Sequence, residues 1–279
     1  MKLSIFTTCS NPIERQDPFY EAISCYKDLA DEVIIINGKI GDEYNLETEL
    51  VQMNDKVKVV RYEWPEEFSW EFIGQQFQRG YEACTGDWII HADLDFFFHE
   101  NDFDKIRKTL EENSEEPAVS FWKYQFLLVD RYRLKSRLVI TVNKGKYKNR
   151  IKFNSGGDLC QPSLDGMELK PDTVKEIGVP FYNYDFCFKE KNVIAKEFYR
   201  MAKARNKVFP NDNWGIESKE KALEYFKKMQ LGRFENNLND YKKIKLEDHP
   251  RYIQDRIYNI KPNQFGFNMF SWIKEKSYE

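Results

Sequence analysis

Two aspartates separated by one residue, Asp93 and Asp95, are the residues of this sequence with the clearest capacity for chemistry. They follow the apolar run 88–92, which predicts a buried strand. Side chains two residues apart on an extended segment point to the same side, so the two carboxylates should converge. Hard carboxylate oxygens with few other protein ligands suit Mg2+ or Mn2+, which take their remaining ligands from water and substrate phosphates. The spacing therefore predicts a divalent-cation site.

The alternative is that Asp93 and Asp95 only cap the helix that begins near Phe103 or lie solvated in a loop, because this tripeptide pattern is common. The preceding elements favour the chemical interpretation. Strands are predicted at 2–8, 33–36, 57–62 and 88–92, with helices after Asp17-Pro18 and after Ser69. Strands that alternate with helices predict an α/β fold with a parallel sheet, whose ligands bind at the carboxyl ends of the strands. The two aspartates follow such an end.

Composition limits the classes of protein to consider. The chain has 279 residues, enough for one large α/β domain, alone or with an accessory lobe. It is 41% hydrophobic with a mean hydropathy of -0.71, and no transmembrane segment is apparent. The net charge of -3 provides no positive field for nucleic acid. Five scattered cysteines without a C-x-x-C pair, and no signal peptide, lead us to expect a cytoplasmic protein.

Three segments resemble the GT-A class of nucleotide-sugar-dependent glycosyltransferases, most closely its family 2-like members. The residues are Ser4 to Asn11 (SIFTTCSN), Gly80 to Asp95 (GYEACTGDWIIHADLD) and, more weakly, Val179 to Phe186 (VPFYNYDF). The resemblance implies a GT-A, Rossmann-like, mostly parallel sheet flanked by helices. It also implies a nucleotide-sugar-binding half at 1–105 and an acceptor half of the same domain at 106–210. A helical and irregular extension would follow at 211–279.

The same resemblance implies roles for individual residues. Those expected to contact the donor nucleotide are Thr7, Thr8, Asn11, Asn37, Asp42, Arg79, Asp93 and Leu94. Those expected to hold Mn2+ or Mg2+ are Asp93, Asp95, Asn183 and Asp185. Asn183 stands where many relatives have a histidine, and an amide oxygen can also bind a hard cation.

The activity that the resemblance implies is metal-dependent, inverting transfer of a sugar from a nucleotide diphosphate to a hydroxyl of a glycan-type acceptor. Such a reaction needs a carboxylate to take the acceptor proton. Asp158 and Asp165 are the candidates, with Asp165 slightly preferred, because both lie in loops punctuated by glycine. Either could instead form only a local Asx turn.

Two basic segments allow more than one interpretation. The run 144–152 contains no acidic residue and predicts a solvated hairpin tip, with closure over a diphosphate or an anionic acceptor as the alternative. The segment 189–208 predicts an amphipathic helix docked on the domain, with weak contact to an anionic membrane surface as the alternative.

Two other functions compete with a transferase. One is a non-catalytic carbohydrate- or nucleotide-binding module on a transferase-like fold. The other is a phosphatase of the haloacid dehalogenase type, which also places two such aspartates after an apolar strand. The phosphatase is the weaker alternative, because its motif opens the fold, whereas about 90 residues precede the motif here.

Overall fold

The computed structural model describes residues 1–38, 55–65, 67, 69–153 and 161–260. Its centre is a nine-stranded mixed sheet with the order β3-β2-β1-β4-β7-β6-β11-β5, and β12 pairs with β7. The strands are β1 (Leu3–Cys9), β2 (Glu32–Asn37), β3 (Val57–Arg61), β4 (Trp88–His91), β5 (Phe96–Phe97), β6 (Ala118–Leu128), β7 (Arg131–Asn143), β11 (Lys175–Asn183) and β12 (Tyr241–Lys243). A separate three-stranded sheet contains β8 (Ile151–Lys152), β9 (Ser163–Leu164) and β10 (Met167–Glu168).

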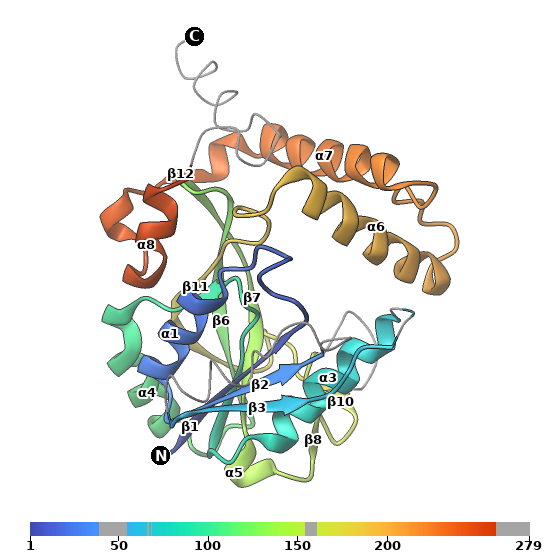
Figure 1. Cartoon of the computed structure of the whole chain (residues 1–279). Helices are drawn as coiled ribbons and strands as arrows, with labels where there is room; N and C mark the ends of the chain where they lie inside the picture. Colours follow the sequence, from blue (N-terminus) through green and yellow to red (C-terminus); the bar gives the residue numbers. More distant parts are fainter. Residues whose placement is uncertain (39–54, 66, 68, 154–160, 261–279) are drawn as a thin grey trace.

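The helices lie around this sheet (Figure 1). They are α1 (Phe19–Leu29), α3 (Trp70–Ala83), α4 (Phe103–Glu112), α5 (Lys144–Tyr147), α6 (Lys191–Val208), α7 (Lys219–Asn236) and α8 (Arg251–Tyr258), with short 3-10 turns at Glu100–Asp102, Leu238–Asp240 and Leu246–Asp248. No helix in the described residues is both long enough and apolar enough to cross a membrane.

The strand order places a switch point between β1 and β4. The chain builds β1, β2 and β3 outward as parallel neighbours, and then returns to lay β4 parallel on the other side of β1. At such a point the loops leave in opposite directions and open a crevice outside the carboxyl ends of the strands. The expectation of a parallel sheet holds for these four strands, whereas β7 and β12 introduce antiparallel pairing. The fold is therefore a Rossmann-like α/β fold with a mixed second half.

The sheet is buried on both faces, as the apolar run in β2 shows. Val33 and Ile35 join one core cluster with α1, α4 and α8, whereas Ile34 and Ile36 join a second cluster with α3. Alternate residues of a strand point to opposite faces, so a continuous apolar run requires cover on both sides. Helices α1 and α3 consequently hold opposite faces of the sheet and fix the direction in which the strand ends point.

The helices α6 and α7 lie side by side in the upper part of the view (Figure 1). The predicted helix in 189–208 is confirmed as α6. Helix α7 continues to Asn236 and contains Gly232. A glycine inside a helix costs only about 1 kcal/mol relative to alanine, and packing can outweigh that cost.

The basic run 144–152 is not a solvated hairpin tip. It begins with α5, and the side chain of Lys144 is buried. The Lys144 ammonium donates to the carbonyl oxygens of Tyr81 at 2.6 Å, Cys84 at 2.5 Å and Glu82 at 3.1 Å. These carbonyls belong to the end of α3, where a cation is favoured by the helix dipole. This lysine therefore caps α3.

Candidate active site

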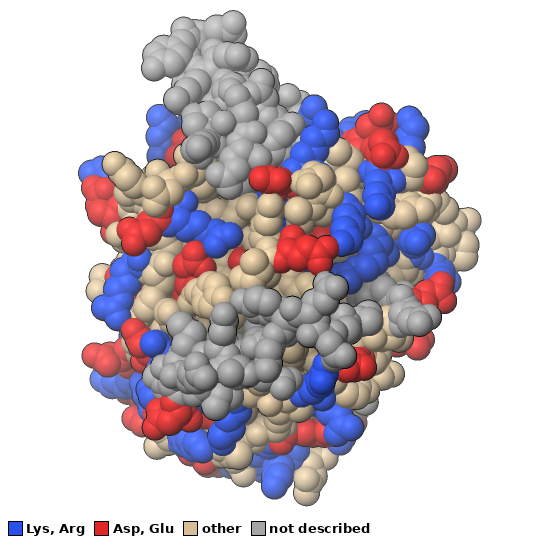
Figure 2. Space-filling model, in the orientation of Figure 1, with Lys and Arg blue, Asp and Glu red and all other residues tan. Residues whose placement is uncertain are grey.

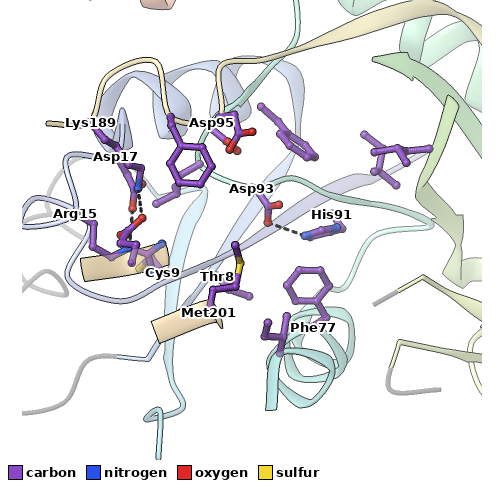
Figure 3. Close-up of a pocket in the computed structure, with 18 of the residues that line it drawn as sticks. Thr8, Cys9, Arg15, Asp17, Phe77, His91, Asp93, Asp95, Lys189 and Met201 are labelled. Atoms are coloured by element: carbon purple, nitrogen blue, oxygen red, sulfur yellow. Dashed lines mark hydrogen bonds and ion pairs between the residues drawn. The ribbon is translucent and has the colours of Figure 1, made fainter. Parts of the chain in front are cut away.

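A cavity of about 420 Å3 lies at the carboxyl ends of β1 and β4. Its walls come from the β1 end, the turn after β4, helix α3, the segment after β11 and helix α6 (Figure 3). The charged and titratable side chains that line it are Cys9, Arg15, Asp17, His91, Asp93, Asp95, Asp185, Lys189, Glu197 and Arg200. The cavity therefore lies at the switch point of the sheet.

Asp93 and Asp95 both line this cavity, together with Asp185 from the turn after β11. Burial, followed by the charges of Asp93 and Asp185, raises the pKa of Asp95 well above its ordinary value. The side-chain amide of Asn183 donates to Asp95 Oδ2 at 3.0 Å. Residues almost 90 positions apart thus place carboxylates against one another, an arrangement that suits a cation or a shared proton.

A tight turn holds the two aspartates in place. The Phe96 amide donates to the Asp93 carbonyl at 2.8 Å, and the Tyr26 hydroxyl donates to the carbonyls of Asp93 and Phe96. The turn leads directly into β5, which pairs with β11. The alternative that these aspartates cap α4 is wrong, because that helix begins at Phe103, beyond β5 and a 3-10 turn.

Asp185 follows β11 in an unusual backbone conformation. Its φ of 40° lies in the left-handed region, which aspartate enters more readily than most residues. Its Oδ2 accepts a hydrogen bond from Gln125 Nε2 at 3.4 Å. The Asp185 carboxylate thus reaches the cavity two residues after Asn183. Asn183 is the last residue of β11, and its side chain donates to Asp95.

A second charged group, which sequence reasoning missed, lines another part of the cavity, beside Asp95 and away from His91 (Figure 3). Lys189 Nζ lies 2.5 Å from Asp17 Oδ1 and 2.9 Å from Glu197 Oε2. Arg15 Nε lies 2.5 Å from Glu197 Oε1. Figure 3 shows Arg15, Asp17 and Lys189 together on one side of the cavity, away from His91. These ion pairs join the loop between β1 and α1 to the start of α6.

Asp17 illustrates why this group was missed. The pair Asp17-Pro18 predicts a helix cap, yet the cap position of α1 is Pro18 and has no side-chain hydrogen bond. The carboxylate of Asp17 instead binds Lys189, 172 residues away. The only local signal is the basic character of 189–208. In the space-filling view basic side chains gather beside acidic ones over α6 (Figure 2).

Arg200 adds a further cation to this wall. Burial, together with the charge of Arg15, lowers the pKa of Arg200 from its ordinary value. Burial alone would raise the pKa of Glu197, but the charges of Arg15 and Lys189 outweigh it and lower that pKa. Because Arg15, Lys189 and Arg200 face two carboxylates here, this wall carries one net positive charge. The cavity thus has an acidic side and a basic side.

The structure places the residues expected to contact the nucleotide in different surroundings. Thr8 and Leu94 line the cavity. Thr7 is fully buried and Asn37 is buried at the end of β2, and neither lines the cavity. Asn11 lies in the loop after β1 with a φ of 48° and donates to Glu14.

The remaining predicted residues lie elsewhere or outside the described residues. Arg79 is on the outer side of α3, over the ring of Tyr62, and does not line the cavity. Asp165 lies in the exposed turn between β9 and β10, where Arg150 binds its carboxylate and lowers its pKa. The cavity does not include Asp165. Asp42 and Asp158 fall outside the described residues.

The described residues fit a divalent cation only in part. They contain no group of three or more His, Cys, Asp or Glu side chains arranged to hold a metal ion. The Asn183 amide group donates to Asp95, so this residue orients a carboxylate through its nitrogen. However, Mg2+ and Mn2+ sites commonly use one or two carboxylates and complete their shell with water and substrate phosphates. Asp93 and Asp95, which both line the cavity, provide two such carboxylates.

Comparison of the sequence with family models and with curated proteins finds no match. Among solved structures, the chain is similar to Staphylococcus aureus TarS residues 1–349 in complex with UDP, with a TM-score of 0.44 and 12% identity over 91% of this chain and 78% of that chain. The TarS complex with UDP-GlcNAc has a TM-score of 0.44 and 10% identity, over 84% and 80%. The bifunctional IspDF of Campylobacter jejuni has a TM-score of 0.34 and 10% identity, over 53% and 42%.

Proposed function

We propose that this protein is a glycosyltransferase that moves a sugar, of the hexose class, from a nucleotide diphosphate donor to a hydroxyl of a glycan-type acceptor. The observation that carries this proposal is the position of Asp93 and Asp95. They line a cavity at the switch point of a Rossmann-like sheet, where Asp185 also reaches them. This is the place where such sheets bind nucleotides.

The two sides of the cavity suit the two ends of a metal-bound diphosphate. On the acidic side, Asp95 with Asp93 or Asp185 would hold Mg2+ or Mn2+, which when bound stabilises negative charge that develops on the leaving diphosphate. On the basic side, Lys189 and Arg200 would meet phosphate oxygens with charge-assisted hydrogen bonds. The cavity volume of about 420 Å3 lies within the range of small-molecule sites.

We propose that the transfer inverts the sugar carbon, with one carboxylate as the base for the acceptor hydroxyl. Asp158 stays a candidate. Asp165 is a poorer one, because Arg150 binds it and lowers its pKa, which weakens it as a base. Asp185 becomes a third candidate, since it lies on the cavity itself. Turnover of the Asp158→Asn, Asp165→Asn and Asp185→Asn variants would separate the three.

A thermal-shift experiment on the full chain tests the proposal. We expect UDP, GDP or dTDP with Mn2+ to raise the Tm. At a nucleotide concentration of one hundred times the Kd, the free energy of unfolding should rise by about 2.7 kcal/mol. Asp95→Asn should abolish the shift. Asp104→Asn, on the exposed face of α4, is the matched control and should retain it. No shift with any of the three nucleotides would overturn the proposal.

Turnover then separates an enzyme from a binding module. Release of nucleoside diphosphate from a matching sugar nucleotide should be measurable for the wild-type chain and lost in Asp95→Asn. A shift in Tm without any release, across the common sugar nucleotides and with oligosaccharide acceptors present, would support the non-catalytic module.

A further inference from the structure

His91 is the last residue of β4 and contacts the first aspartate of the motif. Its Nε2 lies 3.1 Å from Asp93 Oδ1. Because a carboxylate oxygen only accepts hydrogen bonds, Nε2 carries the hydrogen of this contact. The side chain of His91 is 11% exposed, whereas that of Asp93 is 46% exposed. Asp93 therefore has a half-exposed side chain that lines the cavity and contacts a mostly buried ring through one oxygen.

Two aromatic rings hold the imidazole in place. Phe77, from α3, has its centroid 3.8 Å from that of His91, and Phe6, from β1, stacks on His91 at 5.2 Å with an interplanar angle of 30°. Phe6 and Phe77 also contact each other edge to face, at 5.9 Å. Closely packed side chains cannot leave their rotamers without cost, so the direction of Nε2 is fixed by the core.

Gly80 makes this packing possible. A Cβ atom at position 80 would lie 2.3 Å from Phe6 Cδ2. Any other residue there would force the Phe6 ring, which stacks on His91, to shift from this position. Contacts thus run from α3 through Phe6 to His91 and then to Asp93.

We propose that His91 is a positioning residue, which fixes the Asp93 carboxylate through Oδ1 and leaves Oδ2 to face the donor nucleotide and its cation. This inference rests on the proposed function for the identity of the ligand, but the position of the carboxylate can be tested without it. The hydrogen-bond partners of groups that bind a metal or ligand are often worth about 10- to 100-fold in affinity or activity.

Two variants separate the hydrogen bond from the packing. His91→Leu keeps an apolar side chain against the rings of Phe6 and Phe77 but removes the donor. His91→Gln keeps a nitrogen donor at about the reach of Nε2. We expect the Kd for the nucleoside diphosphate with Mn2+, and the donor KM, to rise about tenfold in His91→Leu, with a smaller change in kcat. His91→Gln should recover most of the affinity.

His99→Leu is the matched control, since this histidine lies after β5 and does not line the cavity. It should leave the Kd unchanged. Crystal structures of the wild type, His91→Leu and His91→Gln give the second readout: one orientation of Asp93 in the wild type and His91→Gln, and a changed or multiple orientation in His91→Leu. An unmoved Asp93 in His91→Leu would overturn the inference, as would equal losses of affinity in both variants. Failure of the wild type to bind any nucleotide would overturn only the proposed function.

Discussion

Asn183 donates its side-chain amide to Asp95 Oδ2 at 3.0 Å and joins the end of β11 to the acidic motif after β4. Asn183 is 4% exposed, so the donor of this hydrogen bond is buried. The contact supplies a donor to a carboxylate that is crowded by Asp93 and Asp185. The residue expected to be a metal ligand therefore acts first as a support for Asp95.

Asn183→Asp should convert this support into a further source of repulsion. The change removes the donor and adds a carboxylate beside Asp95, so we expect the variant without metal to lose about 1–3 kcal/mol of stability. Mn2+ should raise the Tm of the variant more than that of the wild type. Melting curves over a MnCl2 series measure both effects. Asn101→Asp, at an exposed position, is the control. An unchanged Tm of Asn183→Asp without metal would contradict the prediction.

The pKa of Asp95 predicts a gain of stability when its charge is removed. Burial and the neighbouring carboxylates raise this pKa in the folded chain above the ordinary value near 3.8. The folded state therefore retains a proton that the unfolded state releases, so stability falls as the pH rises from about 4 towards the folded pKa. Asp95→Asn should raise the Tm at pH 7, by about 2–4 °C per kcal/mol, while nucleotide binding is lost. A lower Tm at pH 7 would contradict this prediction.

Glu32 should contribute stability with the opposite dependence on pH. Burial opposes its charge, but hydrogen bonds from Lys58, the Thr85 amide and Ser4 outweigh that effect and lower its pKa from 4.5 to about 2. The contribution is complete above pH 4.5 and is lost as the pH falls towards 2, on the order of 2–3 kcal/mol. In urea unfolding, Glu32→Gln should have a lower free energy of unfolding than the wild type at pH 7. This difference should shrink below pH 4. A loss independent of pH would argue against the charged network.

The buried side chain of His249 predicts a further effect of pH on the stability of the chain, between pH 4 and pH 6.5. It is 1% exposed, and the Tyr184 hydroxyl lies 2.7 Å from its Nδ1. Burial lowers its pKa from 6.5 to about 4, so in this range only the unfolded state takes up a proton. Stability should therefore fall as the pH drops from 6.5 to 4, by up to about 1.4 kcal/mol per pH unit. His249→Gln should flatten this slope in urea unfolding, and an unchanged slope would assign it to other groups.

The sequence allowed the first half of the fold to be predicted, because its signals are local. The apolar runs in β1, β2 and β4 and the helical spacing in α3 predict their own elements. The pattern cannot reveal that β7 lies between β4 and β6, since pairing partners depend on contacts across the whole sheet. Periodicity could therefore not predict the strand pairing in the mixed half of the sheet.

The same distinction applies to the site. Asp93 and Asp95 are neighbours in the chain, so their convergence could be predicted from spacing alone. The ion pairs of Asp17 and Glu197 with Lys189 depend on how the start of α6 meets the loop between β1 and α1, and no local pattern encodes that contact. Asp165 shows the converse, because a glycine-flanked loop suggested an exposed functional carboxylate and the structure pairs it with Arg150.

The pairing of β5 with β11 has a consequence for synthesis of the chain on the ribosome. The acidic motif is complete once residue 95 has been made, but Asn183 and Asp185 emerge almost 90 residues later. Long-range pairing of this kind must overcome a large loop-closure entropy and slows folding. The nascent chain therefore carries its unsupported carboxylates through roughly a third of translation, from residue 95 to residue 183 of 279. The cavity can close only after β11 has left the ribosome.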